Sequence, residues 1–311
     1  MFGLAGPEGG AARAQDLYWN GGGSTGTLTG GAGTWSVNGL NWTDSTASTP
    51  NAAWTGTNAI FGGTTAATVM IDSSAAAGGT INVSGITFSI NNYTLGPNTS
   101  SPPDSILTLV SPGAGAPVEI NVAGSGNSAV ISAVLAGSAG LHKTGDGYLF
   151  LEAANTYTGD TTISAGTVGT GVGGFGGSSA DVTIENNATI VTYVQGVVMD
   201  SLTIGTGGGI LNGGGAISSQ VYFRTGNLQG AGDLTIDGTS LTTTGNSTYS
   251  GTITLKNDSV LQVGIAINPS YENGSLAADV VFGGTSGSAM VVTGVAAEAL
   301  ISGNLSSTDA S

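Results

Sequence analysis

Residues 140–168 read Gly-Leu-His-Lys-Thr-Gly-Asp-Gly-Tyr-Leu-Phe-Leu-Glu-Ala-Ala-Asn-Thr-Tyr-Thr-Gly-Asp-Thr-Thr-Ile-Ser-Ala-Gly-Thr-Val, and this stretch decides the fold. It holds two short runs of apolar and β-branched residues, Tyr148–Leu151 and Thr161–Ile163, which are typical of β-strands. Turn residues such as glycine bound both runs. Sandwiches and barrels usually have longer strands. A β-solenoid suits short strands, because each strand pairs with the equivalent strand one coil away.

The same pattern recurs along the rest of the chain. The segment Tyr157–Ile163 returns in shortened form as Tyr249–Ile253, and a glycine-containing turn precedes each copy, at Gly145–Gly147 and Gly230–Gly232. Helical spacing of apolar residues does not persist beyond two turns. We therefore predict an all-β solenoid with Val, Ile and Leu inward, Thr, Ser and Asn outward, and Gly or Asn at the corners. Further strands are predicted at 68–71, 80–83, 86–90, 106–110, 118–122, 182–184, 189–192, 202–204, 221–223, 234–236, 252–255, 260–263 and 280–282.

The composition excludes several classes of protein. The chain has 311 residues with 56 glycines, 7% charged residues and a formal net charge of −15. Its four basic residues cannot form an electropositive patch, which excludes nucleic-acid binding. One histidine and no cysteine exclude thiol catalysis, disulfides and zinc sites, and no cofactor is expected. No run approaches the roughly 18 apolar residues of a membrane helix, so no transmembrane segment is expected.

The tryptophans divide the chain. All four lie within the first 54 residues, and bulky side chains can cover the exposed first coil of a solenoid. We predict a Trp-rich N-terminal cap region at 16–62, followed by the solenoid at 63–311. Residues 1–15, which contain Ala12-Arg13-Ala14, are interpreted as the remnant of an export signal or as an assembly arm.

The stretch quoted above closely resembles the autotransporter-associated β-strand repeat, or passenger-associated transport repeat, of bacterial autotransporter passengers. The openings Tyr18–Gly21, Gly33–Trp35, Asn41–Trp42 and Ala59–Phe61 are also similar to those of such passengers. The repeat positions matched are Gly140, Leu141, Lys143, Thr144, Gly145, Gly147, Leu149, Leu151, Asn155, Thr156, Tyr157, Gly159, Thr161, Thr162, Ile163, Gly166 and Thr167.

The resemblance implies a right-handed parallel β-helix exported to the extracellular or outer-membrane surface of a Gram-negative bacterium. It also implies that the repeat aids passenger folding and transport. A complete autotransporter ends in a membrane barrel, whereas this chain stops at Ser311. The chain is therefore expected to be a fragment of a longer precursor that carries an outer-membrane translocator, or a free protein that reuses the passenger fold.

Catalysis is not expected. His142 occupies the free position of the repeat, and a catalytic role would require a nucleophile and an acid from other coils. Calcium would need clustered carboxylates, whereas the aspartates that follow are isolated: Asp44, Asp72, Asp104, Asp200 and Asp258. Carboxylate pairs that could serve glycoside hydrolysis are Asp181 with Glu185, Asp233 with Asp237, and Asp146 with Glu152. The glycine-rich runs 169–177 and 205–215 lack the lysine of a phosphate loop and are interpreted as turns or outward loops.

Three functions remain at this stage. The first is a non-catalytic structural subunit of an extracellular fibre, surface layer or biofilm that self-assembles with copies of itself through its ends, with Phe2 and Leu4 as contacts. Open solenoid edges and low charge favour such stacking. The alternative is a passenger acting as a cell-surface adhesin, with exposed aromatic residues and an unidentified host or matrix glycan as partner. The remote alternative is a β-helix carbohydrate-active enzyme.

Overall fold

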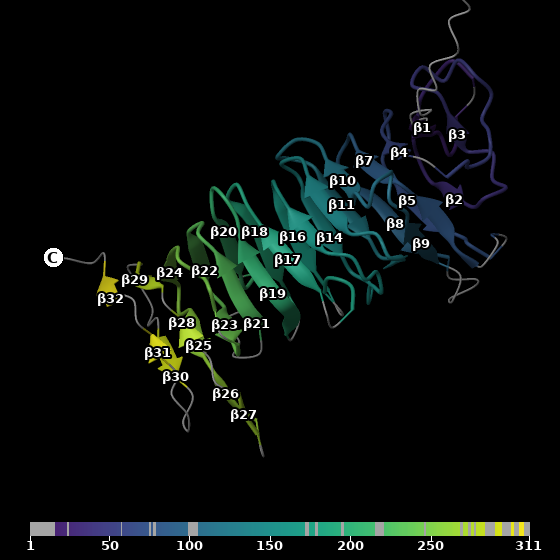
Figure 1. Cartoon of the computed structure of the whole chain (residues 1–311). Coiled ribbons are helices and arrows are strands. Elements are labelled where there is room, and N and C mark those ends of the chain that lie inside the picture. The colour runs from purple at the N-terminus through teal and green to yellow at the C-terminus, as the bar shows by residue number, and fades with distance from the viewer. Residues whose placement is uncertain are drawn as a thin grey trace, which may run out of the picture.

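The computed structural model is an elongated stack of β-strands (Figure 1). The residues that it describes form strands and turns, with no α-helix. The predicted assembly arm, with Phe2 and Leu4, lies outside the described residues. The described residues are 16–23, 25–56, 58–74, 76, 79–98, 105–171, 174–177, 180–193, 196–214, 221–245, 247–267, 270–272, 275–276, 278–283, 290–293, 300–301 and 305–307.

Two long sheets run the length of the stack. The 13-stranded sheet has the spatial order β3 (Trp42–Thr43), β1 (Asp16–Trp19), β4 (Asn58–Phe61), β7 (Gly85–Phe88), β10 (Val118–Val122), β13 (Leu141–Thr144), β15 (Thr161–Ile163), β17 (Asp181–Ile184), β19 (Val197–Ile204), β21 (Tyr222–Gly230), β23 (Ser240–Thr243), β25 (Val260–Val263), β30 (Met290–Thr293). The 12-stranded sheet has the order β2 (Gly33–Trp35), β5 (Thr68–Ile71), β8 (Tyr93–Pro97), β11 (Ser128–Ile131), β14 (Tyr148–Leu151), β16 (Thr167–Thr170), β18 (Ala188–Thr192), β20 (Gly209–Asn212), β22 (Leu234–Asp237), β24 (Thr252–Lys256), β29 (Asp279–Phe282), β32 (Leu305–Ser307).

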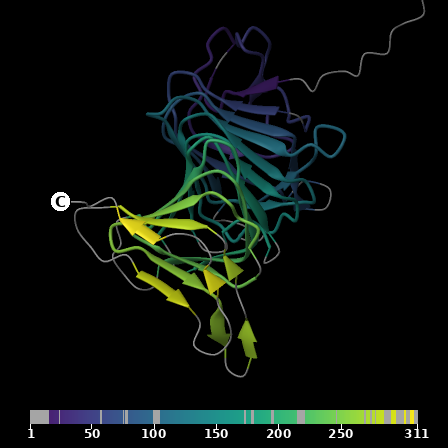
Figure 2. The same cartoon turned by 60° about the vertical axis from the view of Figure 1, so that its left-hand side comes forward.

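Smaller sheets complete the molecule. A short third parallel sheet consists of β12 (Val134–Ala136), β9 (Ile106–Leu109) and β6 (Ile81–Val83). Near the C-terminal end, an antiparallel pair joins β26 (Ile265–Ile267) to β27 (Ser270–Glu272), and a parallel pair joins β28 (Ser275–Leu276) to β31 (Leu300–Ile301). The turned view shows the coils of the central part enclosing a common interior (Figure 2).

From β13 to β25 the chain alternates between the two long sheets, so each coil adds one parallel strand to each sheet. Side chains alternate between the interior and the outer face, as the period of a β-strand requires. One interior row across the 13-stranded sheet is made of register partners that are all buried: Ala59, Ile86, Ile120, Lys143, Ile163, Ile184 and Ile204. This arrangement is a parallel β-solenoid, which confirms the predicted fold class.

Both glycine-rich runs interpreted as turns or outward loops contain strand residues, since β16 ends at Thr170, inside the run 169–177. β20 runs through the glycine-rich segment 205–215, which the sequence had indicated to be a turn or outward loop. Gly209 lies at an inward position, where a Cβ atom would stand 2.6 Å from Cγ2 of Ile184. The glycine therefore serves close packing inside a strand, and its presence does not end the strand.

The four tryptophans form one aromatic cluster with Phe61 at the N-terminal end. Trp35 contacts Trp42 and Trp54 edge-on, with both pairs of ring centroids 4.8 Å apart, and Trp42 also packs against Trp19. Trp19, Trp35 and Trp42 are fully buried. Phe61 then stacks on Phe88. The cluster is continuous with the solenoid core and closes it at this end.

We expect Trp42→Ala to lower the free energy of unfolding by about 3 to 5 kcal/mol, because it removes a fully buried aromatic side chain. Trp42→Phe should cost less, about 1 to 2 kcal/mol, because it leaves a smaller cavity and removes a buried Nε1–H that has no partner among the described residues. Urea denaturation followed by circular dichroism measures both. Leu40→Ala, at a side chain that is 63% exposed, is the control and should change stability little. Equal losses for all three variants would contradict the role of the cluster.

Candidate functional site

The repeat at 140–168 supplies four successive strands, β13 to β16, and so belongs to two adjacent coils of the solenoid. Among its residues, Leu141, Leu149, Leu151, Thr161 and Ile163 are buried and face the interior. Thr162 and Thr167 are half-buried and stand at the alternate positions of their strands. The predicted repeat residues therefore divide between core positions, corners and the outer face.

Lys143 is the unexpected member of the core. It stands between Ile120 and Ile163 in the interior row and is fully buried. Its ammonium group donates to the carbonyl oxygens of Thr144 at 2.9 Å, Gly145 at 2.7 Å and Ala165 at 3.2 Å. The three acceptors match the three N–H donors of the group. Burial lowers the pKa of Lys143 to about 8, and the nearby Asp146 carboxylate opposes this shift.

Asn155 and Tyr157 lie in the coil that follows β12, the last strand of the third sheet, and their side chains make hydrogen bonds there. The Asn155 side chain accepts a hydrogen bond from the amide of Leu135 at 2.9 Å and donates to the carbonyl of Gly174 at 3.4 Å. It thus joins the preceding coil to the following one. The Tyr157 hydroxyl pairs with Thr161 Oγ1 at 2.7 Å, and its burial raises the pKa of Tyr157 well above the usual value. Thr156 donates its amide to the carbonyl of Leu135.

The glycines of the repeat mark places where adjacent coils nearly touch. A Cβ atom at Gly140 would lie 2.4 Å from the carbonyl oxygen of Asp160. Gly145 has a φ of 73° and would place a Cβ atom 2.4 Å from the carbonyl oxygen of Val122. Side chains at these corners would force the coils apart. Gly147, Gly159 and Gly166 are in similarly close contact with neighbouring coils.

His142 belongs to a chain of hydrogen bonds on the outer face. Its Nε2 lies 2.7 Å from Ser164 Oγ, and Ser164 donates its hydroxyl hydrogen to Glu185 Oε1 at 2.6 Å. Because the hydroxyl hydrogen is used, His142 is the donor to Ser164. A catalytic triad needs the opposite polarity, with the imidazole accepting the proton of the serine. The arrangement therefore stabilises the surface and does not activate a nucleophile.

Several of the carboxylates considered for catalysis or calcium accept hydrogen bonds from neighbouring groups, and Asp104 lies outside the described residues. Asp181 accepts from the Ser201 hydroxyl, and Asp233 accepts from the amide of Thr252. Asp44 accepts from the hydroxyls of Thr46 and Ser48 and from nearby amides, which hold the pKa of Asp44 far below its usual value. In the described part of the chain, no three His, Cys, Asp or Glu residues are grouped as metal ligands would be.

An aromatic cluster lies outside the core, on the outer face of the 12-stranded sheet. Tyr148 and Phe150 stack with centroids 6.4 Å apart, and Tyr193 meets Phe150 edge-on at 6.0 Å. Gly169 leaves room for both strand rings, since a Cβ atom there would lie 1.9 Å from the Tyr148 hydroxyl. Tyr193 is 51% exposed. We call these three residues the outer aromatic cluster. In the sequence, Tyr148 and Phe150 alternate with Leu149 and Leu151, and this alternation indicates that the two rings lie on the face of the strand opposite to the leucines.

The comparisons with known proteins agree with the fold. Residues 141–168 match the family model described as the passenger-associated transport repeat. The repeat and the parallel solenoid together define an autotransporter passenger, whose place is the extracellular or outer-membrane surface of a Gram-negative bacterium. The described residues contain no helix long and apolar enough to span a membrane.

The chain is 32% identical over 260 residues to the adhesin BmaC autotransporter of Brucella suis biovar 1 (strain 1330). The match covers 82% of this chain and 7% of that protein. No solved structure matches the chain.

The buried lysine predicts a pH dependence of stability. The folded-state pKa of Lys143 is about 8 against an ordinary 10.5, so between these values the unfolded chain binds more protons. The free energy of unfolding should therefore rise with pH in this window, by about 1 to 2 kcal/mol from pH 7.5 to 9.5. Measurements should stop at pH 9.5. Burial raises the pKa of the buried tyrosines, so at higher pH they ionise in the unfolded chain before they ionise in the folded protein, and this lowers the free energy of unfolding.

Urea titrations across this pH range measure the effect. Lys143→Met should abolish the rise, whereas Lys256→Met, at an exposed lysine, should keep it. A Lys143→Met protein with the parent slope would show that another group causes the dependence.

Proposed function

We propose that this chain is a non-catalytic segment of an autotransporter passenger that acts as a cell-surface adhesin. The observation that carries the proposal is the similarity to an autotransporter adhesin across 82% of the chain. The chain spans only 7% of that protein. What we propose is therefore that this chain itself binds cells.

Two features of the structure support the proposal: the apolar side chains are packed in the interior, and an aromatic cluster lies on an outer face. In the described part of the chain, the interior is filled by apolar side chains from successive coils. The outer aromatic cluster gives a partner an apolar contact area on a rigid sheet, with a tyrosine hydroxyl at its rim. Exposed aromatic residues of this kind were the feature expected of an adhesin.

The adhesin hypothesis takes precedence over a fibre subunit because the similarity is to an adhesin. Assembly through Phe2 and Leu4 stays a prediction, since both residues lie outside the described part of the chain. An enzyme is not favoured, because the His142–Ser164–Glu185 chain has the wrong polarity for a nucleophile.

The test is the binding of the fluorescently labelled full-length chain to epithelial cell monolayers. We expect saturable binding by a monomeric chain. Tyr193→Ser should weaken binding about fivefold or more, corresponding to about 1 kcal/mol, because it removes the most exposed ring of the cluster. Tyr222→Ser, at an exposed tyrosine on the other long sheet, is the matched control and should bind as the parent does.

Sedimentation and electron microscopy of the same material separate the two structural functions. Monomeric rods that bind cells support the adhesin. Filaments formed by a chain that does not bind cells would overturn it in favour of the fibre subunit, and the absence of saturable binding would overturn it in any case.

A further inference from the structure

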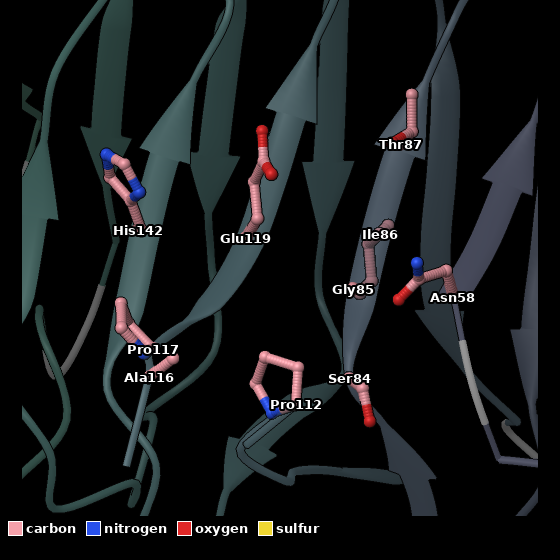
Figure 3. Close-up of a pocket in the computed structure, with 10 residues that line it drawn as sticks. All are labelled: Asn58, Ser84, Gly85, Ile86, Thr87, Pro112, Ala116, Pro117, Glu119 and His142. Atoms are coloured by element: carbon pink, nitrogen blue, oxygen red, sulfur yellow. The ribbon is translucent and has the colours of Figure 1, made fainter. Parts of the chain in front are cut away.

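A polar hollow of about 340 Å³ opens on the outer face of the 13-stranded sheet (Figure 3). Strand β7 forms its floor. Asn58 of β4 borders it on one side, and Glu119 of β10 and His142 of β13 border it on the other. Its end is closed by Pro112 and Pro117, from the connection between β9 and β10. The volume falls within the range of small-ligand sites.

The register of the strands explains why the hollow lies here. Asn58, Gly85, Glu119 and His142 are successive partners in one row across four adjacent strands. Because Gly85 has no side chain, Asn58 can lean over it, and a Cβ atom at Gly85 would stand 2.6 Å from Asn58 Oδ1. Asn58 Nδ2 donates to Asp16 Oδ1 at 3.0 Å. The amide orientation therefore leaves Oδ1 toward the hollow as an acceptor.

Glu119 offers a second acceptor. Its Oε1 accepts the Thr144 hydroxyl at 2.6 Å, and Thr144 in turn accepts from Asn121 at 2.9 Å. This network draws the carboxylate toward β13, away from Gly85. No donor to Oε2 is found in the described part of the chain, so that oxygen can accept a hydrogen bond from a ligand.

His142 adds a third acceptor. Its Nε2–H donates to Ser164, whose own hydrogen goes to Glu185, and the tautomer with the hydrogen on Nε2 carries its lone pair on Nδ1. The hollow is thus bordered by acceptors on both sides of Gly85, and its ligand must supply donors on both sides.

Hydroxyl groups on a sugar ring meet this requirement. Asn58 and Glu119 stand on strands two positions apart, roughly 9 to 10 Å between backbones, and a ring with hydroxyls around its edge can reach both. A single ammonium group would reach one side only. Calcium requires six to eight oxygen ligands, about twice what these side chains supply. The pyrrolidine rings of Pro112 and Pro117 provide an apolar wall for the C–H face of a sugar.

We propose that this hollow binds a neutral sugar unit of a surface glycan, held between Asn58 Oδ1 and the Glu119 carboxylate. The proposal names the ligand class of the adhesin. That the sugar belongs to a surface glycan rests on the proposed adhesin function. The site lies on a different sheet from the outer aromatic cluster, so the two can be tested separately.

Saturation-transfer NMR on the full chain tests the site, with D-galactose, D-glucose, D-mannose and N-acetyl-D-glucosamine as probes. We expect at least one sugar to bind with millimolar affinity. Gly85→Thr should weaken it about tenfold or more, because the new side chain displaces Asn58 and fills the floor. Threonine suits this row, which continues as Thr162 and Thr183. Glu119→Gln should weaken binding about fivefold by replacing a charged acceptor with a neutral one.

Two controls are matched to these variants. Gly96→Thr adds the same side chain to the other long sheet, where a Cβ atom meets only ordinary contacts, and Asp181→Asn neutralises an outer-face carboxylate outside the hollow. Both should bind sugar as the parent does, and circular dichroism should show all four variants folded.

The outcomes separate this site from the adhesin function. Failure of all four sugars to bind, or unchanged sugar binding by Gly85→Thr, overturns the site. Binding of acetyl-arginine amide in place of sugars overturns it in favour of a cationic peptide. If cells bind Gly85→Thr as well as the parent, the adhesin stands and the site does not serve it. If sugars bind but cells do not, the site stands and the adhesin function fails.

Discussion

Backbone pairing between successive coils imposes the spacing on which the rest of this molecule depends. Paired strands lie about 4.8 Å apart, so an interior side chain on a strand within the sheet has a register partner directly before and after it. Rows of mostly similar side chains fill this space, as in the interior row of isoleucines that contains Lys143 between Ile120 and Ile163. The same spacing leaves no room for a Cβ atom at corners such as Gly140, where the carbonyl of the next coil intervenes. Both the apolar rows and the glycine-rich composition follow from one distance.

Lys143 shows how a charge is accommodated under this constraint. A buried ammonium group is costly unless hydrogen bonds replace its hydration. The strand β13 ends at a corner, and the carbonyls of Thr144 and Gly145 from that corner converge with the carbonyl of Ala165 from the next. The ammonium therefore satisfies carbonyls from two coils at once. Its alkyl stem continues the interior row between Ile120 and Ile163. The repeat lysine thus acts as a link between coils and is not a surface charge.

The fold could be predicted from the sequence because the strand pattern is local. Alternation over three or four residues is visible in Tyr148–Leu151 and needs no knowledge of the neighbouring coil. The burial of Lys143 could not be predicted, since it depends on the register with Ile120 and Ile163 and on the carbonyl of Ala165, which is 22 positions away. The hollow could not be predicted from the sequence either, because it forms only where Asn58, Gly85 and Glu119 are register partners. Coil length varies too much for such partners to be found by counting: Lys143 pairs with Ile163, whereas Ile86 pairs with Ile120.

The variable coil length also explains where recognition can arise. The coil between Ile86 and Ile120 is longer than the repeat coil, yet both keep the parallel register with their neighbours. Between β9 and β10 of this coil the chain leaves the sheets as the connection that contains Pro112 and Pro117, with positive φ at Gly113, Ala114 and Gly115 to turn the chain. An outward connection disturbs no interior row, so its composition is free of the packing constraint. In this architecture the interior rows set stability, and the connections and outer side chains are free to determine what the surface binds.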